Sequence, residues 1–535
     1  MNKYQEILKQ YWGYDSFRDL QEEIITSIGE GKDTLGLMPT GGGKSITFQV
    51  PALAQEGICI VITPLIALMK DQVQNLRKRG IKALAIYSGM TRQEILTALE
   101  NCIFGNYKFL YISPERLDTD IFRTKLRSMK VSMITVDESH CISQWGYDFR
   151  PAYLKIAEIR TLLPGIPVLA LTATATPEVV KDIQARLDFR EENVFRMSFE
   201  RKNLAYIVRQ TDNKTQELLH ILRKIPGSAI IYVRNRRRTK EITELLVNED
   251  ITADFYHAGL DNAVKDLRQK RWQSGEVRVM VATNAFGMGI DKSNVRWVIH
   301  YNLPKSIESF YQEIGRAGRD GMPSDTLLFY SLGDLILLTK FATESNQQSI
   351  NLEKLQRMQQ YAEANICRRR ILLSYFGEKV EKDCGNCDVC RNPPEQFDGT
   401  IIVQKALSAI ARTGEQIGTS MLIDILRGSF SSELVERGYE KLKTFGVGRD
   451  ISARDWQDYL LQILQMGFFE IAYNENNHLK ITEIGNDILF GRKKTKLVAI
   501  RREENTTSKR RGKKVVVNKE LPLGLTTTEN KDLFE

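Results

Sequence analysis

The sequence predicts an α/β fold in which two parallel-sheet lobes follow one another and a helical region comes last. Short apolar runs alternate with helical stretches between about residues 20 and 200, and the alternation resumes between about residues 229 and 328. Alternation of this kind is typical of parallel sheets covered by helices on both faces. The chain has 535 residues, and single cores rarely grow beyond about 300 residues, so several domains are expected. After Gly333 the pattern becomes helical and then reaches a cluster of cysteines.

The expected strands are the apolar runs themselves. They cover residues 58–63, 109–113, 133–137 and 168–172 in the first lobe, and residues 229–233, 277–281 and 297–300 in the second. Residues 400–490 are expected to form a compact helical unit closing on a hairpin, with strands 468–473 and 478–482 around an Asn-rich turn. From Gly491 onward the chain is basic and low in apolar residues, which predicts a disordered linker.

The composition excludes several classes of protein. Hydrophobic residues make up 42% of the chain and charged residues 27%, as in ordinary globular domains. Residues 1–10 are polar and contain no signal-peptide core, and no apolar run is long enough to cross a bilayer. Seven cysteines, an odd number without secretory features, argue against a disulfide framework. We therefore expect a soluble, cytoplasmic protein, and the net charge of +9 is compatible with a polyanionic partner.

Residues 39–45, Pro-Thr-Gly-Gly-Gly-Lys-Ser, predict a phosphate-binding loop. They lie between a strand candidate at 33–38 and a helix candidate at 46–54, an order that points backbone N–H groups and the positive end of the helix dipole at one place. Lys44 would reach the β- and γ-phosphates, and the Ser45 hydroxyl would bind Mg²⁺. The usual pattern has glycine where Met38 stands, and the alternative is a flexible glycine turn. The expected loop contacts are Thr40, Gly41, Gly42, Gly43, Lys44 and Ser45.

Two adjacent acids, Asp137 and Glu138, end an apolar strand candidate, which is where α/β sheets place catalytic groups. Asp137 would hold Mg²⁺, and Glu138 would orient and deprotonate the attacking water. The alternative is a solvated acidic turn. With the phosphate loop upstream, the pair predicts hydrolysis of a nucleoside triphosphate.

Four cysteines predict a metal centre. Cys367 lies upstream of Cys384, Cys387 and Cys390, which are spaced C-x-x-C-x-x-C. Four thiolates suit tetrahedral Zn²⁺, and they leave no open position, so the role would be structural. The zinc would tie the helix carrying Cys367 to the loop that follows, and an iron–sulfur centre is the alternative. The remaining cysteines, Cys59, Cys102 and Cys141, are expected to be ordinary buried thiols.

Taken together, these segments resemble the superfamily 2 helicases and, within them, the RecQ family. The segments that carry the narrower resemblance are 12–18 with 21–23, 141–151, 283–291 and 312–321. The resemblance implies two RecA-like lobes, a zinc-binding module and a winged-helix domain. It also implies that Tyr14 stacks on adenine while Arg18 and Gln21 contact it. Glutamine suits this role because its side-chain amide can donate and accept hydrogen bonds at N7 and N6 together.

By the same resemblance, residues 141–151 form an aromatic-rich loop that couples single-stranded DNA to ATP hydrolysis. Trp145 and Phe149 offer faces on which bases can stack, and Arg150 and His257 complete the expected DNA-coupling set. The family usually has histidine where Tyr147 stands. The alternatives are ordinary core aromatics and a structural histidine.

In the second lobe, Arg316 and Arg319 are three residues apart, which would put them on one face of a helix. The resemblance implies that Arg316 is the arginine finger and that Arg319 serves ATP binding or coupling between lobes. Asp291 and Gln312 would bridge the site across the cleft. A basic surface helix is the alternative.

The resemblance implies these domains: lobe 1 at 1–205, lobe 2 at 206–340, the zinc module at 341–398, the winged helix at 399–490, and a basic linker at 491–535. The winged helix would bind duplex phosphates, and its hairpin near 473–478 would separate the strands. Residues 530–535 look like the opening of a further helical domain, so a truncated or natural short form is expected.

We therefore expect an ATP-dependent 3′–5′ DNA helicase that acts in recombination and repair with ATP, Mg²⁺ and Zn²⁺. Its partners would be single-stranded and duplex DNA, with a single-stranded-DNA-binding protein as a candidate and no membrane. It is expected to be a monomer associated with the nucleoid. An RNA helicase and a DNA-binding scaffold with a vestigial ATPase are the alternatives.

Overall fold

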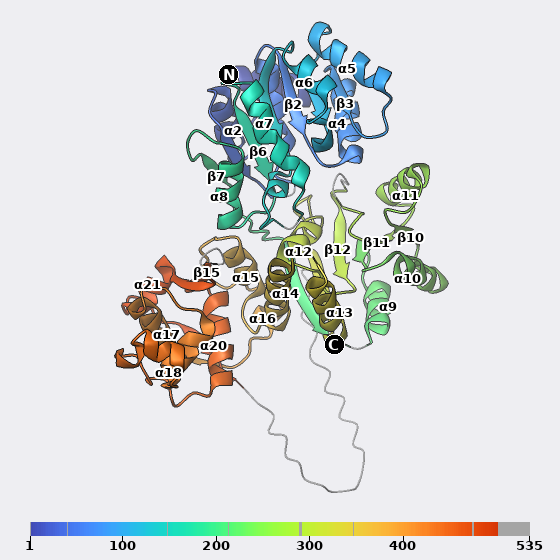
Figure 1. Ribbon diagram of the computed structural model, residues 1–535. Coiled ribbons are helices and arrows are strands. Elements are labelled where there is room, and N and C mark those ends of the chain that lie inside the picture. Colours follow the sequence, from blue (N-terminus) through green and yellow to red (C-terminus); the bar gives the residue numbers. More distant parts are fainter. Residues whose placement is uncertain are drawn as a thin grey trace. The chain divides into compact units, whose positions relative to one another are not determined.

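The computed structural model describes residues 2–39, 41–146, 148–211, 213–287, 292–345, 347–472 and 476–500 (Figure 1). Its chain divides into two compact units. Unit 1 comprises residues 1–201, 211–322 and 331–355, and unit 2 comprises residues 202–210, 323–330 and 356–535. Among the described residues, no helix combines the length and the apolarity that a membrane crossing requires.

Unit 1 opens with a seven-stranded sheet whose order is β3-β4-β2-β5-β6-β1-β7. Every recorded pairing in it is parallel. β1, β2, β4 and β6 are buried along their whole length, because helices cover both faces of such a sheet. The strands are β1 (Thr34–Leu37), β2 (Ile58–Ile62), β3 (Ala83–Ile86), β4 (Phe109–Ile112), β5 (Val131–Val136), β6 (Val168–Thr172) and β7 (Val194–Arg196).

The helices between these strands pack apolar side chains against the sheet. Phe48 and Met69, from two different helices, lie in one buried cluster with Phe109 and Leu171 from the strands. The helices are α1 (Lys3–Trp12), α2 (Gln21–Gly29), α3 (Lys44–Ala54), α4 (Ile66–Lys78), α5 (Arg92–Phe104), α6 (Asp120–Leu126), α7 (Lys155–Leu162) and α8 (Pro177–Arg186). Short 3₁₀ helices lie at Pro114–Arg116, Ser139–Ile142 and Pro151–Leu154.

The strand order explains where a site can form. β6 pairs with β1 on one side and with β5 on the other, both in parallel. The loops that follow β1, β5 and β6 therefore leave the sheet at the same edge, which is where parallel sheets bind ligands. The phosphate loop follows β1, and the acid pair follows β5.

Unit 1 also contains four parallel strands of the second lobe, in the order β10-β11-β9-β12. They are β9 (Ser228–Tyr232), β10 (Ala253–Tyr256), β11 (Val279–Ala282) and β12 (Val295–His300). The accompanying helices are α9 (Lys214–Lys224), α10 (Arg236–Asn248), α11 (Asn262–Ser274), α12 (Ile307–Ile314) and α13 (Leu332–Thr343). A further helix, α14 (Gln348–Glu363), begins in unit 1 and continues into unit 2 from Gln356. Side chains of Asn213, Asn235 and Ser306 accept backbone N–H groups at the starts of α9, α10 and α12, which fixes where those helices begin.

Unit 2 contains a parallel pair, β8 (Leu204–Gln210) and β13 (Ser324–Tyr330), and a helical part. Its helices are α15 (Arg368–Tyr375), α16 (Asp388–Arg391), α17 (Thr400–Arg412), α18 (Thr419–Arg427), α19 (Ser432–Glu436), α20 (Ala453–Gln465) and α21 (Glu483–Leu489), with a 3₁₀ helix at Tyr439–Lys441. β15 (Phe469–Ala472) and β16 (His478–Ile481) form an antiparallel hairpin, which confirms the predicted one. Residue 473 of the expected wedge lies outside the described residues.

The prediction of a linker from residue 491 is wrong for its first part. β17 (Lys496–Val498) pairs with β14 (Gln396–Asp398) in an antiparallel ladder, and Leu497 is fully buried. A Cβ atom on Gly399 would stand 2.3 Å from Leu497 Cγ. Two apolar residues among lysines are therefore enough to attach this segment to the fold. The rest of the predicted linker, residues 501–535, lies outside the described residues.

Candidate active site

The phosphate loop has the backbone that its sequence predicts. Gly41 and Gly43 have φ angles of 88° and 77°, a left-handed region in which glycine is the favoured residue. Gly43 caps α3 without a side-chain hydrogen bond, and Lys44 is the first residue of that helix. The N–H groups at the start of α3 are therefore left for a ligand, and the helix dipole favours an anionic one. Thr40, an expected member of this loop, lies outside the described residues.

Gln21, at the start of α2, holds the phosphate loop in place. Its Nε2 donates to the carbonyl oxygens of Gly42 and Gly43, both at 3.2 Å, while its Oε1 accepts the backbone N–H of Arg18 at 2.9 Å. Arg18 in turn donates to the carbonyl of Gly41 at 3.4 Å. Gln21 is 2% exposed, whereas Tyr14 is 51% exposed and offers an open ring face. The structure thus brings the predicted adenine-contacting residues Arg18 and Gln21 onto the phosphate loop.

The acid pair lies opposite the loop lysine. Lys44 Nζ is 3.8 Å from Glu138 Oε1, and both side chains are largely buried. Glu138 has a φ of 49°, unusual for a residue with a side chain, and its N–H donates to Asp137 Oδ1 at 2.9 Å. Glu138 Oε2 is buried and has no hydrogen-bond partner among the described residues. An unsatisfied carboxylate oxygen beside a lysine is suited to hold a water molecule.

Asp137 has the electrostatic environment of a cation ligand. Burial, together with the adjacent charge of Glu138, raises the pKa of Asp137 to about 6, and the charge of Lys44 opposes the shift. Two neighbouring carboxylates with one lysine leave an excess of negative charge in a largely buried site. A divalent cation with oxygen ligands would offset that excess, so the residues present fit Mg²⁺.

His140 connects the acid pair to the end of β6. Its Nδ1 lies 2.8 Å from Thr172 Oγ1 and 3.4 Å from Glu138 Oε2. Burial is the main reason that the pKa of His140 falls to about 3, and Lys44 lowers it further. The imidazole is therefore neutral at physiological pH. The sequence did not predict a role for this histidine; its place two residues after Glu138 was the available signal.

The aromatic-rich segment continues from His140. Trp145 and Phe149 are both half-buried. Arg150 forms hydrogen bonds with Asp148 Oδ2 at 3.0 and 3.1 Å and donates to the carbonyl of Pro64 at 3.3 Å. Residue 147, at the position where the family usually has histidine, lies outside the described residues. The exposed parts of the two rings leave room for stacking.

The two arginines do not share a helix face, so that prediction is wrong. α12 ends at Ile314, and Arg316 and Arg319 lie in the turns that follow. Glycines flank Arg316 in this stretch, and Gly318 has a φ of 56°, which ends the helical path. Arg201 donates to the carbonyls of Gly315, Ala317 and Gly318 at 3.2, 2.8 and 3.1 Å. Arg201 was missed at the sequence level, since it lies more than a hundred residues away from these partners in the chain.

Arg316 and Arg319 differ in their surroundings. Arg316 is 4% exposed, its Nε has no hydrogen-bond partner among the described residues, and a Cβ on Gly287 would lie 3.0 Å from its Nη2. For Arg319, a Cβ on Gly41 would lie 3.8 Å from Cγ, so this side chain reaches the phosphate loop. Gln312, on α12, is 8% exposed.

The predicted DNA-coupling residue His257 is buried. His257 follows β10, is 6% exposed, and stacks on Phe255 at 5.7 Å. Neither ring nitrogen has a hydrogen-bond partner among the described residues, and a direct DNA contact would require this ring to become exposed. Asp291 lies outside the described residues.

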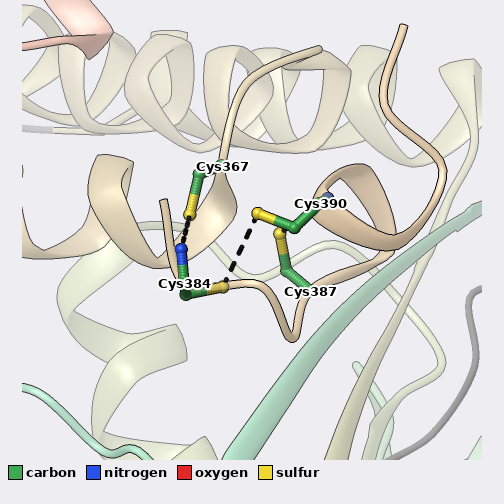
Figure 2. A group of neighbouring side chains, drawn as sticks. All are labelled: Cys367, Cys384, Cys387 and Cys390. Atoms are coloured by element: carbon green, nitrogen blue, oxygen red, sulfur yellow. Dashed lines mark hydrogen bonds between the residues drawn. The ribbon is translucent and has the colours of Figure 1, made fainter. Parts of the chain in front are cut away.

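Four cysteines meet in unit 2, as predicted (Figure 2). The sulfur atoms of Cys367, Cys384, Cys387 and Cys390 all lie within 4.8 Å of one another. Cys384 Sγ and Cys390 Sγ are 3.8 Å apart, which is about the separation of two sulfurs in a tetrahedral site with Zn–S bonds of about 2.3 Å. Backbone N–H groups of Cys384 and Cys390 donate to Sγ atoms of the cluster, as thiolates require. The residues therefore fit Zn²⁺.

The carboxylate of Asp388 links the cysteine cluster to its surroundings by hydrogen bonds. Asp388, between two of the cysteines, accepts from Arg368 Nε at 2.6 Å and from the N–H of Val208 in β8 at 2.9 Å. Cys367 is the residue before α15 rather than part of a helix, which corrects the expected helix-borne cysteine. Cys59, Cys102 and Cys141 are buried free thiols, as predicted.

The phosphate loop follows β1, the acid pair follows β5, and two arginines follow α12 in a second parallel-sheet lobe. Together they define a nucleoside-triphosphatase of the helicase class. Residues 18–183 match the family model of the DEAD/DEAH box helicases, and residues 213–321 match the helicase conserved C-terminal domain. Residues 332–391 match the RecQ zinc-binding model and residues 393–506 the RQC domain. The chain belongs to the RecQ family.

Individual relatives of known name support the same family assignment. The chain is 42% identical to the ATP-dependent DNA helicase RecQ of Pasteurella multocida (strain Pm70), over 91% of this chain and 78% of that protein. It is 38% identical to the ATP-dependent DNA helicase RecQ of Bacillus subtilis (strain 168), over 100% of this chain and 88% of that protein. Among solved structures, the DUF1998 helicase MrfA bound to DNA superposes with a TM-score of 0.53 at 17% identity, covering 68% of this chain and 57% of that one. That likeness concerns the fold alone.

Proposed function

We propose that this protein is an ATP-dependent DNA helicase that moves 3′ to 5′ along single-stranded DNA and unwinds duplexes in recombination and repair. The observation that carries the proposal is the distance of 3.8 Å between Lys44 Nζ and Glu138 Oε1, within the loop that Gln21 ties down. A lysine for the phosphates and a carboxylate for water are the two parts that hydrolysis needs. The 3′–5′ direction and the role in repair rest on family membership.

We assign the nucleotide site as follows. Tyr14, Arg18 and Gln21 bind adenine. The loop from Thr40 to Ser45 binds the phosphates. Ser45 and Asp137 hold Mg²⁺, which when bound shields the charge of the phosphates. Glu138 takes the proton of the attacking water, because its buried Oε2 has no hydrogen-bond partner among the described residues, while its Oε1 lies 3.8 Å from Lys44 Nζ.

The second lobe would complete this site. Arg316 is assigned as the arginine finger, since its Nε is free to donate to a phosphate, and Arg319 couples the lobes from its position against Gly41. Gln312 and Asp291 would bridge the cleft. Binding of DNA would affect the nucleotide site through Trp145, Phe149, Arg150 and His257.

The zinc module and the winged helix favour DNA over RNA as the substrate. We propose that lobe 1 spans residues 1–205, lobe 2 residues 206–340, the zinc module 341–398, and the winged helix 399 to about 500, because Val498 of β17 exchanges two hydrogen bonds with Gln462 of α20. The protein would act as a cytoplasmic, nucleoid-associated monomer, with a single-stranded-DNA-binding protein as a candidate partner.

The decisive experiment compares ATP turnover with and without oligothymidylate in the wild type and in Lys44→Ala. We expect DNA to stimulate the wild type strongly and to have no effect on the variant. Lys181→Ala, which changes an exposed lysine of α8, is the matched control and should behave as the wild type. Equal low rates in the wild type and in Lys44→Ala would favour the scaffold, and unwinding confined to RNA duplexes would favour an RNA helicase.

A further inference from the structure

A lysine far along the chain contacts the aromatic-rich segment. Lys354, on α14, donates from Nζ to the carbonyl oxygen of Gly146 at 2.6 Å. Both residues belong to unit 1, although 208 residues separate them. A buried ammonium group needs acceptors for its donors, so this carbonyl stabilises the lysine, and the lysine fixes the carbonyl.

Gly146 cannot move without moving its neighbours. A Cβ atom on Gly146 would lie 2.3 Å from the carbonyl oxygen of His140 and 3.0 Å from that of Ser143. The Gly146 N–H donates to the Ser143 carbonyl at 3.0 Å, and the Trp145 N–H donates to Ser143 Oγ at 3.2 Å. Residues 143–146 thus form a tight turn packed on the backbone of His140, with Trp145 within it.

The other end of this turn reaches the hydrolysis site. His140 Nδ1 lies 3.4 Å from Glu138 Oε2. A continuous set of contacts therefore runs from Lys354 through Gly146 to His140 and Glu138. Each link is a backbone packing contact or a polar contact of 3.4 Å or less, so a displacement at one end has a physical route to the other.

Lys354 also interacts electrostatically with α12, the helix that carries Gln312. Burial lowers the pKa of Lys354, and the carboxylate of Glu308, on α12, opposes that shift. Glu308 is 3% exposed and lies four residues before Gln312 on the same helix. Lys354 is therefore hydrogen-bonded to the turn that holds Trp145, and its charge interacts with that of Glu308 on the helix that leads to Arg316.

We propose that Lys354 is a positioning residue that holds the turn of residues 143–146 against His140, and so transmits binding of single-stranded nucleic acid at Trp145 to hydrolysis at Glu138. This inference rests on the proposed function. Lys354 acts by donating to the Gly146 carbonyl, and its charge also contributes to the lowered pKa of His140.

The test uses the full chain and measures the stimulation ratio, which is ATP turnover with saturating oligothymidylate divided by turnover without it. Lys354→Met keeps the length and apolar stem of the side chain but removes its donors, and should lower the ratio by about threefold or more. Lys354→Arg keeps a donor for the Gly146 carbonyl and should restore most of the ratio. Lys340→Met, at an exposed lysine of α13, is the matched control and should leave the ratio unchanged.

A double-mutant cycle separates transmission from a general loss of stability. If Lys354 acts through the turn, Lys354→Met should lower the ratio little further once Trp145→Phe is present, because the two residues serve one route. Three results would each overturn the inference. The first is a double variant whose ratio falls by the product of the two single losses. The others are a Lys354→Met protein that loses turnover equally with and without DNA, and one whose ratio is unchanged. A wild type whose ATP turnover ignores DNA would instead refute the proposed function itself.

Discussion

The side-chain amide of Gln21 occupies the space that a side chain on Gly43 would need. A Cβ atom on Gly43 would stand 2.3 Å from Gln21 Nε2, and that same nitrogen donates to the Gly43 carbonyl at 3.2 Å. The residue proposed to read the base and the loop proposed to hold the phosphates are therefore packed as one piece. Recognition of adenine and the shape of the phosphate loop should not be separable by mutation.

Gly43→Ala tests this packing. The substitution adds a methyl group at a φ of 77°, which costs about 1–2 kcal/mol, and it also displaces Gln21. We expect ATP affinity to fall by about tenfold or more and the preference for ATP over GTP to weaken, as measured by fluorescence titration with labelled nucleotides.

Gly31→Ala is the control for Gly43→Ala. Gly31 has a similar φ of 84°, but nothing lies within 4 Å of its Cβ position. This variant should suffer the backbone strain alone, with nucleotide affinity close to that of the wild type. A Gly43→Ala protein that keeps both affinity and base preference would contradict the coupling of Gln21 to the loop.

Glu138→Gln tests the proposed general base. Glutamine keeps the shape of the side chain but cannot take up a proton, so turnover should fall by about 10²- to 10⁴-fold, while ATP binding stays within a fewfold of the wild type. Single-turnover hydrolysis and equilibrium binding separate the two quantities. Glu191→Gln, at an exposed position, is the control, and a loss of less than tenfold in Glu138→Gln would assign the proton to another group.

Arg316→Lys and Arg319→Lys distinguish the two arginines. Lysine keeps the charge but loses the planar fork that matches a phosphate. For Arg316→Lys we expect turnover to fall by about 10³-fold or more with ATP affinity retained, as for an arginine finger. For Arg319→Lys, whose side chain lies against the phosphate loop, we expect mainly weaker ATP binding. The opposite pattern would exchange the two roles.

The contiguous motifs could be predicted from the sequence because their chemistry needs neighbours in the chain. The phosphate loop at residues 39–45, the acid pair Asp137–Glu138 and the closely spaced cysteines each depend on residues a few positions apart. Their local geometry follows from a strand, a turn and a helix in order. The alternation of strands and helices likewise fixed the parallel sheets, since both faces of their strands must be apolar.

What could not be predicted depends on distant partners. Residues 491–498 looked like linker because three lysines and an arginine stand beside only two apolar residues. The pairing with β14, about a hundred residues earlier, makes the end of this segment a strand. The helix expected at Arg316 ends early, since Arg201 holds the carbonyls of the following turn. The contact of Lys354 with Gly146 has no signal in the sequence at all. Contacts of this kind appear only once the chain is folded.

The cysteine cluster leads to a prediction about stability. A structural zinc site contributes about 10–16 kcal/mol in small zinc-binding peptides, which is as large as the whole free energy of unfolding of a typical domain. We therefore expect Cys387→Ser to lower the melting temperature of unit 2 markedly and to reduce bound zinc from about one ion per chain to nearly none, as measured by calorimetry and elemental analysis.

Cys102→Ser is the matched control, because Cys102 is a buried thiol outside the cluster. It should keep its zinc and lose only the small contribution of one buried side chain. Chelation of the wild type at neutral pH should reproduce the effect of Cys387→Ser. The contacts of Asp388 with Arg368 and with Val208 join the cluster to β8, but they do not join the four sulfur atoms to one another as a metal ion does. Bound iron in place of zinc, together with the visible absorption of an iron–sulfur cluster, would establish the iron–sulfur alternative. A wild type that keeps its melting temperature after complete removal of metal would refute the structural role.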